Sequence, residues 1–193
     1  THAGSFDITY LSTLPNFVVM AASDEAELVK MINTSVDINN KPCAIRYPRG
    51  TGFGIELPSI DNKIKIGKGR VVQEGNQACI LNLGARLEEC KLASEELKIK
   101  GISTTIVDAR FAKPLDQELI LKCARDHEVM ITIEEGSIGG FGSHVKNLLA
   151  EKGLFDKGLK FRSMTLPDTF IEQDSPKKMY ELAGLNASQI SKK

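Results

Sequence analysis

Two arginine side chains, Arg46 and Arg49, offer the clearest chemistry in this sequence. A guanidinium group presents a planar set of N–H donors that matches the oxygens of a carboxylate or a phosphate. Residues Cys43 to Tyr47 have the composition of a short strand, which Pro48 is expected to end because it cannot donate to a strand ladder. Ligands of open α/β sheets bind at the carboxyl ends of strands. The pair therefore indicates an anion site, although capping of a sheet edge or surface ion pairing would use the same residues.

Histidine is the other residue type here with catalytic potential. His2 lies in a loop of small residues just before an expected helix, so a place at a cleft and a plain surface location are equally supported. We interpret His127 as the end of a polar helix, where an imidazolium suits the helix dipole, and His144 as a helix-surface residue. The three histidines are scattered and no D-x-D or H-x-x-x-H cluster appears, so the sequence predicts no metal site.

Residues 1–50 are interpreted as one α/β unit that positions the arginines. The apolar run Phe17–Ala22 has the length and character of a strand buried on both faces. Ser23 is expected to cap a helix that runs from Asp24 to about Val36 with apolar residues at helical spacing. A turn then leads into the strand before Pro48, and strand–helix–strand order is compatible with a parallel pair.

The chain after this unit changes character twice. Residues 51–65 are irregular and rich in turn-forming residues, which indicates a linker. Residues 66–193 then alternate between strands and helices. The expected strands are 70–74, 78–83, 104–108, 129–133 and 161–166, with helices at 86–100 and 142–152 and others opened by Asp116 and Ser175. The fold class is therefore α/β: a partial unit followed by a second domain with a mostly parallel sheet covered by helices.

A glycine-rich stretch, Glu134–His144, follows one of these strands and opens a helix. The backbone N–H groups of such a turn can hold a phosphate. The dinucleotide fingerprint is incomplete, since Val145 stands where the third glycine is required, and two carboxylates precede the loop. We interpret the glycines as allowing the backbone to pack closely against a neighbouring domain.

Composition excludes several classes of function. The chain of 193 residues carries 25 basic and 25 acidic side chains, which leaves no electrostatic case for nucleic acid or an anionic membrane as partner. No apolar run is long enough to span a bilayer. The four cysteines, Cys43, Cys79, Cys90 and Cys123, form no C-x-x-C pair and lie in apolar contexts, which favours buried free thiols in a reducing cytoplasm.

Several segments taken together closely resemble the 1-deoxy-D-xylulose-5-phosphate synthase family. The matching segments are Thr1–Asp7, Val18–Glu25, Arg46–Gly50, Asp108–Asp116, Glu134–Val145 and Leu166–Asp168. The match covers nearly the whole chain. The set of motifs is specific, although the broader family of thiamine-diphosphate enzymes shares weaker versions of several.

This resemblance implies a domain plan and a reaction. Residues 1–50 would be the C-terminal part of a pyrimidine-binding (transketolase central) domain, 51–65 a linker, and 66–193 a transketolase C-terminal domain. The full-length enzyme would condense pyruvate with glyceraldehyde 3-phosphate, release CO2 and form 1-deoxy-D-xylulose 5-phosphate for isoprenoid synthesis. Its carbanion chemistry would come from thiamine diphosphate.

The resemblance also assigns site residues, one by one. His2 matches a family histidine that lines the active site near cofactor and substrate. Arg49 matches an arginine that grips the phosphate of the acceptor, and Arg46 is adjacent and ranks lower. The family works as a homodimer, in the bacterial cytoplasm or in a plant plastid, and the bacterial cytoplasm is the preferred location.

Departures from the family pattern limit what this chain is expected to do alone. The magnesium-binding motif, the glutamate that contacts the cofactor's pyrimidine and the aromatic residues that stack on it do not occur here. Thiamine diphosphate and Mg2+ are therefore expected in the full-length enzyme, and neither is expected to bind this chain, which begins at Thr1 and is interpreted as an inactive fragment. The alternatives are a transketolase or a 2-oxo-acid dehydrogenase β subunit, and a non-catalytic assembly or regulatory module.

Overall fold

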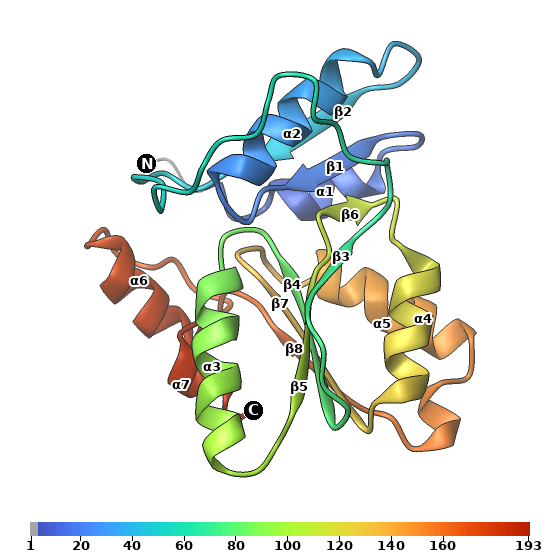
Figure 1. The fold of residues 1–193 in the computed structure, drawn as a ribbon, viewed down its shortest axis with the longest axis vertical. Helices are drawn as coiled ribbons and strands as arrows, with labels where there is room; N and C mark the ends of the chain where they lie inside the picture. The colour runs from blue at the N-terminus through green and yellow to red at the C-terminus, as the bar shows by residue number, and fades with distance from the viewer. Residues whose placement is uncertain (1–3) are drawn as a thin grey trace.

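The structure, a computed structural model, describes residues 4–193 and contains two β-sheets. Figure 1 shows a small sheet with its helices at one end of the molecule and a larger sheet between two helix layers at the other. The α/β fold class predicted from the sequence is confirmed, with both sheets mixed rather than purely parallel. Among the described residues, no helix combines the length and apolar character needed to cross a membrane.

The larger sheet has the strand order β3-β5-β4-β7-β8. Its strands are β3 (Arg70–Gln73), β4 (Ala78–Leu83), β5 (Thr104–Asp108), β7 (Val129–Glu134) and β8 (Lys160–Met164). Its helices are α3 (Leu87–Ile99), α4 (Gln117–Asp126), α5 (Phe141–Glu151), α6 (Pro176–Ala183) and α7 (Ala187–Ile190), with a 3-10 turn at Phe155–Lys157. All pairs are parallel except β3 with β5, and β3 lies at one edge of the sheet.

The side chains of β4 point alternately to the two faces of this sheet, and helices cover both faces. Cys79 and Leu81 pack with the core beneath α4 and α5, whereas Ile80 packs with the core beneath α3, α6 and α7 (Figure 1). Every residue of β4 is buried, as expected for a central strand whose two faces both meet helices. Of the four cysteines, three are buried free thiols and Cys43 is half-buried.

The smaller sheet contains a strand that sequence patterns did not predict. It has the order β2-β1-β6, from β1 (Val18–Ala21), β2 (Cys43–Arg46) and β6 (Phe111–Lys113), and it packs with α1 (Asp7–Thr13) and α2 (Glu25–Val36). β1 and β2 are parallel as expected, but β6 comes from the second half of the chain and pairs antiparallel to β1. The two halves of the chain therefore share one sheet.

The cap of α2 also differs from the expectation. Asp24, not Ser23, is the N-cap, and its side chain accepts from the N–H of Glu27 at 2.7 Å. Ser23 instead donates its hydroxyl to Asp108 at 2.8 Å, across the junction between the halves. Asp116 caps α4 as predicted, since it accepts from the N–H of Leu119.

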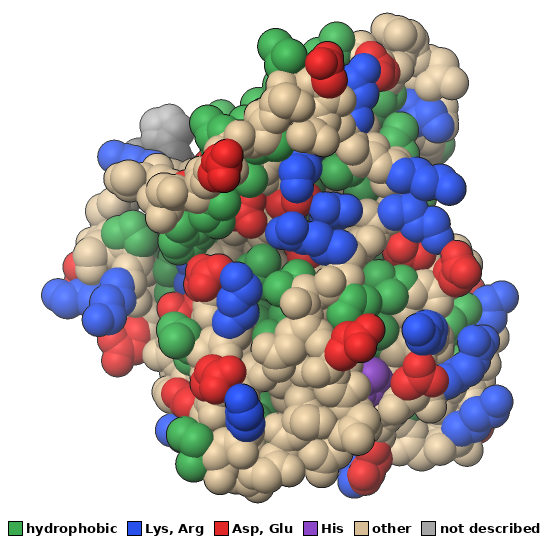
Figure 2. Space-filling view, viewed as in Figure 1, with side chains coloured by type: hydrophobic (Ala, Val, Ile, Leu, Met, Phe, Trp, Pro, Cys, Tyr) green, Lys and Arg blue, Asp and Glu red, His purple; other side chains and the backbone are tan. Residues whose placement is uncertain are grey.

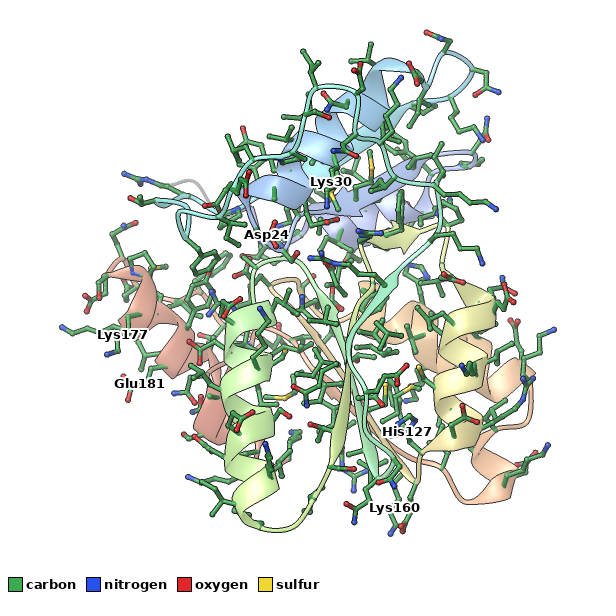
Figure 3. The ribbon with its side chains drawn as sticks, viewed as in Figure 1. Asp24, Lys30, His127, Lys160, Lys177 and Glu181 are labelled. Atoms are coloured by element: carbon green, nitrogen blue, oxygen red, sulfur yellow. The ribbon has the colours of Figure 1, made fainter. Side chains whose placement is uncertain are left out.

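Buried ion pairs join the two halves at one place, which we call the junction network (Asp24, Glu27, Arg70, Asp108 and Arg110). Arg110 binds both carboxylate oxygens of Glu27, at 2.7 and 3.0 Å, and Arg70 reaches Glu27, Asp24 and Asp108. Figure 2 shows Lys and Arg side chains gathered at this level of the molecule, and Figure 3 labels Asp24 and the nearby Lys30. Burial acts to raise the pKa of Glu27, but hydrogen bonds from Arg110 and Lys30 outweigh it and hold that pKa below its ordinary value.

Candidate functional site at the carboxyl ends of the strands

Arg46 is the last residue of β2 and lies at the carboxyl end of that strand, as the sequence predicts. Its Nη1 donates to the backbone oxygen of Glu135 at 2.7 Å, and its Nε lies 3.6 Å from Oδ2 of Asp7. The side chain is 19% exposed, so it keeps some access to solvent while being held on two sides. Arg46 therefore joins the small sheet to the end of β7.

The carboxyl ends of strands from both sheets meet at this point. A hollow there is lined by Ile8, Ala21, Ala22, Arg46, Tyr47, Pro48, Leu83, Gly84, Ala85 and Glu135. Its volume is about 10 Å³, which is the room that one water molecule requires. The hollow is thus one wall of a site at most, and a substrate would need space outside it.

Arg49 lies beyond the end of β2 and does not line the hollow. Its side chain is exposed, and among residues 4–193 no hydrogen bond or ion pair engages it. The structure therefore brings Arg46 to the strand ends but leaves Arg49 outside them. A phosphate role for Arg49 stays a prediction.

Neither His127 nor His144 lines the hollow at the strand ends. His2 falls outside the described residues. His127 precedes β7 at the opposite edge of the sheet, where Nδ1 lies 2.8 Å from the backbone oxygen of Cys123. His144 lies on α5, half-buried, and burial together with the charge of Lys113 lowers its pKa.

Behind Arg46 lies a polar support that sequence reasoning missed. The Glu135 carboxylate accepts from Nε of Arg86 at 3.0 Å, and the Arg86 guanidinium stacks 3.5 Å from the centre of the Tyr180 ring. Burial and the neighbouring Glu135 both raise the pKa of Tyr180, so its hydroxyl stays protonated. The carboxylate pair ending β7 was the signal for this support, but nothing in the sequence pointed to Tyr180 on α6.

The glycine-rich stretch after β7 encloses a carboxylate of its own chain. The buried Glu134 accepts from the N–H of Phe141 at 3.0 Å and of Gly142 at 2.8 Å, at the start of α5. A Cβ at Gly140 would lie 2.4 Å from Oε2 of Glu134, so the loop can surround that carboxylate only if this residue is glycine. The expected packing against a neighbour holds at Gly139, where a Cβ would lie 3.0 Å from the Thr9 side chain of α1.

This enclosed carboxylate predicts a pH dependence of stability. Burial raises the pKa of Glu134 from 4.5 to about 7, although the N–H groups of Gly142 and Phe141 and the charge of Arg46 act to lower it. Between these two pH values the folded protein holds a proton that the unfolded chain has lost, so stability falls as the pH rises. From pH 4.5 to pH 7 the loss should be at most about 3 kcal/mol relative to Glu134→Gln.

Urea unfolding of the wild type and Glu134→Gln at pH 5 and pH 8 measures this loss. The difference in unfolding free energy between the two proteins should shift in favour of the variant at pH 8. A difference that stays constant between the two pH values would show that Glu134 is ionised throughout.

The hollow at the strand ends has little room for a ligand the size of thiamine diphosphate. The N–H groups of the glycine-rich loop already hold Glu134. In the described part of the chain, no three His, Cys, Asp or Glu side chains are grouped to hold a metal ion. Weak binding of thiamine diphosphate and Mg2+ to the chain alone stays a prediction.

Comparison with known proteins identifies the family. The sequence matches the transketolase C-terminal domain over residues 67–190 and the transketolase pyrimidine binding domain over residues 1–52. A solved structure described as a split gene transketolase, in an inactive beta4 tetramer, is similar in fold with a TM-score of 0.82 and 29% sequence identity. The similarity covers 96% of this chain, which spans 59% of the length of that protein. This chain therefore belongs to the transketolase family, of which it carries the C-terminal domain and a part of the pyrimidine-binding domain.

Proposed function

We propose that this chain is part of a thiamine-diphosphate-dependent transferase that condenses pyruvate with glyceraldehyde 3-phosphate, releasing CO2 and forming 1-deoxy-D-xylulose 5-phosphate. In this proposal Arg49 binds the phosphate of the acceptor, Arg46 supports it and His2 lies near the reacting atoms. Thiamine diphosphate and Mg2+ are held mainly by polypeptide outside this chain, in a homodimer. The cofactor supplies the carbanion chemistry, and the residues of this chain bind and orient the acceptor.

The observation that carries the proposal is the contrast between the two arginines. Arg46 is held by Asp7 and the Glu135 backbone at the strand ends, whereas Arg49, three residues on, is exposed. An uncommitted guanidinium beside a rigid strand end suits a phosphate dianion, because two of its N–H groups can bind two phosphate oxygens at once.

Replacing Arg49 with alanine in the complete protein tests the substrate assignment. A charge-assisted hydrogen bond contributes roughly 1.5–3 kcal/mol, so the KM for glyceraldehyde 3-phosphate should rise roughly 10- to 100-fold. The KM for unphosphorylated D-glyceraldehyde should not change, and Arg162→Ala, an exposed arginine on β8, serves as the control. Equal effects on both aldehydes would exclude phosphate binding by Arg49.

A transketolase, or a β subunit that works with a separate partner chain, is the second candidate. The similarity to a solved split gene transketolase, whose beta4 tetramer is described as inactive, favours it. Assay of the complete protein with pyruvate plus glyceraldehyde 3-phosphate, against transketolase ketose donors, separates the two candidates. Turnover of the ketose donors alone would select the transketolase.

The chain alone is expected to bind the cofactor weakly. Calorimetric titration with thiamine diphosphate and Mg2+ should give a dissociation constant weaker than roughly 1 mM, because the family's magnesium-binding motif and the glutamate that contacts the pyrimidine do not occur in this sequence. Micromolar binding would contradict this expectation. Catalysis by neither the chain nor the complete protein would favour a non-catalytic assembly or regulatory module.

A further inference from the structure

Glu25, the first residue of α2, holds the segment that follows Arg49. Its Oε1 accepts from the N–H of Gly54 at 2.6 Å and from the N–H of Ile55 at 2.9 Å. We propose that Glu25 is a positioning residue that fixes the Arg49 loop for phosphate binding. This inference rests on the function proposed above for Arg49.

The loop is shaped around this carboxylate. A Cβ at Gly52 would lie 2.7 Å from Oε1 of Glu25, and Gly54 has a φ of 77°, a conformation that favours glycine. Consecutive backbone N–H groups in such a turn form a small concavity that binds an anion. Oε2 of Glu25 is also enclosed, and no group among residues 4–193 donates to it. The concavity formed by residues 53–55 is thus filled by a carboxylate of the same chain.

Two fixed points then bracket Arg49. Arg46 is held by Glu135 and Asp7 on one side, and Gly54 is held by Glu25 on the other. Without Glu25 the next hydrogen bond between the described part of the segment and α2 is at the Asn62 backbone oxygen, which accepts from Asn33 at 3.2 Å. Losing the Glu25 hydrogen bonds would therefore leave residues 49–61 without a hydrogen bond to α2, and Arg49 would lose its fixed position.

The charge of Glu25 suits this role. Its own N–H and that of Ile55, together with Phe53 and Gly54, lower the pKa of Glu25 against the effect of burial, so the carboxylate is ionised at neutral pH. The N–H groups of Gly54 and Ile55 donate to Oε1 and compensate part of that negative charge. Glu25 can therefore hold the loop through Oε1 at neutral pH.

Steady-state kinetics of the complete protein test the proposal with Glu25→Ala, Glu25→Gln, Arg49→Ala and the double variant Glu25→Ala/Arg49→Ala. Glu25→Ala should raise the KM for glyceraldehyde 3-phosphate about 10-fold, because misplacement of a binding group carries a cost of this order. The kcat should stay within about twofold, and the KM for D-glyceraldehyde should be unchanged. Glu25→Gln keeps one accepting oxygen and should recover much of the loss.

The double variant and two controls separate the outcomes. If Glu25 acts through Arg49, the double variant should be no worse than Arg49→Ala alone, and the amides of Gly54 and Ile55 should exchange faster in Glu25→Ala. Asp37→Ala removes an exposed acid at the other end of α2 and should change no kinetic constant. An unchanged KM in Glu25→Ala alongside a raised KM in Arg49→Ala overturns the positioning role alone. An unchanged KM in Arg49→Ala overturns the proposed function, and the positioning role with it.

Discussion

Replacing Arg110 with alanine should reduce the unfolding free energy by about 3–5 kcal/mol, because it removes the two-point partner of a buried carboxylate. The Glu27 side chain is fully buried and receives two hydrogen bonds from Arg110 at 2.7 and 3.0 Å. Lys30 and Arg70 remain in reach of Glu27, but each approaches it with a single nitrogen. Most of the compensation for burying that charge is therefore lost.

Equilibrium unfolding in urea measures the effect, with Lys160→Ala as the matched control. The Lys160–Glu128 pair is 61% and 69% exposed, so its loss should cost less than about 1 kcal/mol. Adding Glu27→Gln to Arg110→Ala should recover part of the stability, since the buried group is then neutral. If Arg110→Ala costs no more than the control, the junction network contributes little to holding the two halves together.

Gly75→Ala should be comparably damaging, with a loss of about 3 kcal/mol or more. Gly75 lies between β3 and β4, and a Cβ there would stand 2.4 to 2.6 Å from the backbone C, N and O atoms of Thr104. These atoms belong to the first residue of β5 and cannot rotate away as a side chain would. Gly75 also exchanges two hydrogen bonds with the Thr105 hydroxyl, at 3.0 and 2.9 Å, so a shift of the turn would break both.

Gly50→Ala is the matched control, because a Cβ at Gly50 would meet no atom within 4 Å. It should leave stability unchanged or raise it slightly, through the reduced freedom of the unfolded chain. Thermal and urea unfolding of both variants give the comparison. If Gly75→Ala and Gly50→Ala change the unfolding free energy by amounts that agree within about 1 kcal/mol, the turn before β4 can move freely.

Periodicity in the sequence predicted the elements that are stabilised by neighbours close in the chain. The bounds of β4 and β5 agree with the prediction, because these strands are buried along their whole length and their flanking turns are marked by glycine or polar residues. The caps were harder to place. Ser23 and Asp24 are both good N-caps, and only the contact of Ser23 with the distant Asp108 decides between them.

The site shows the same limit. The end of β2 could be predicted to within one residue, at Tyr47 where the strand ends at Arg46, because Pro48 limits it locally. The short strand β6 could not, because its partner β1 lies about ninety residues earlier and three residues carry too little pattern. The hydrogen bonds of Glu135 with Arg46 and Arg86 could not be predicted either. The same is true of the hydrogen bonds from Gly54 and Ile55 to Glu25, because contacts between distant residues produce no periodic pattern in the sequence.

The shared sheet has a consequence for dissecting the molecule. The family boundary near residue 67 separates two sequence domains, but β6, from the second domain, forms one edge of the sheet of the first. A fragment of residues 66–193 alone would contain β6 without its partner β1. A fragment of residues 4–52 alone would expose the edge of β1 that β6 covers. The two sequence domains are therefore not two separable structural modules, and swapping one between relatives would have to carry the matching strand with it.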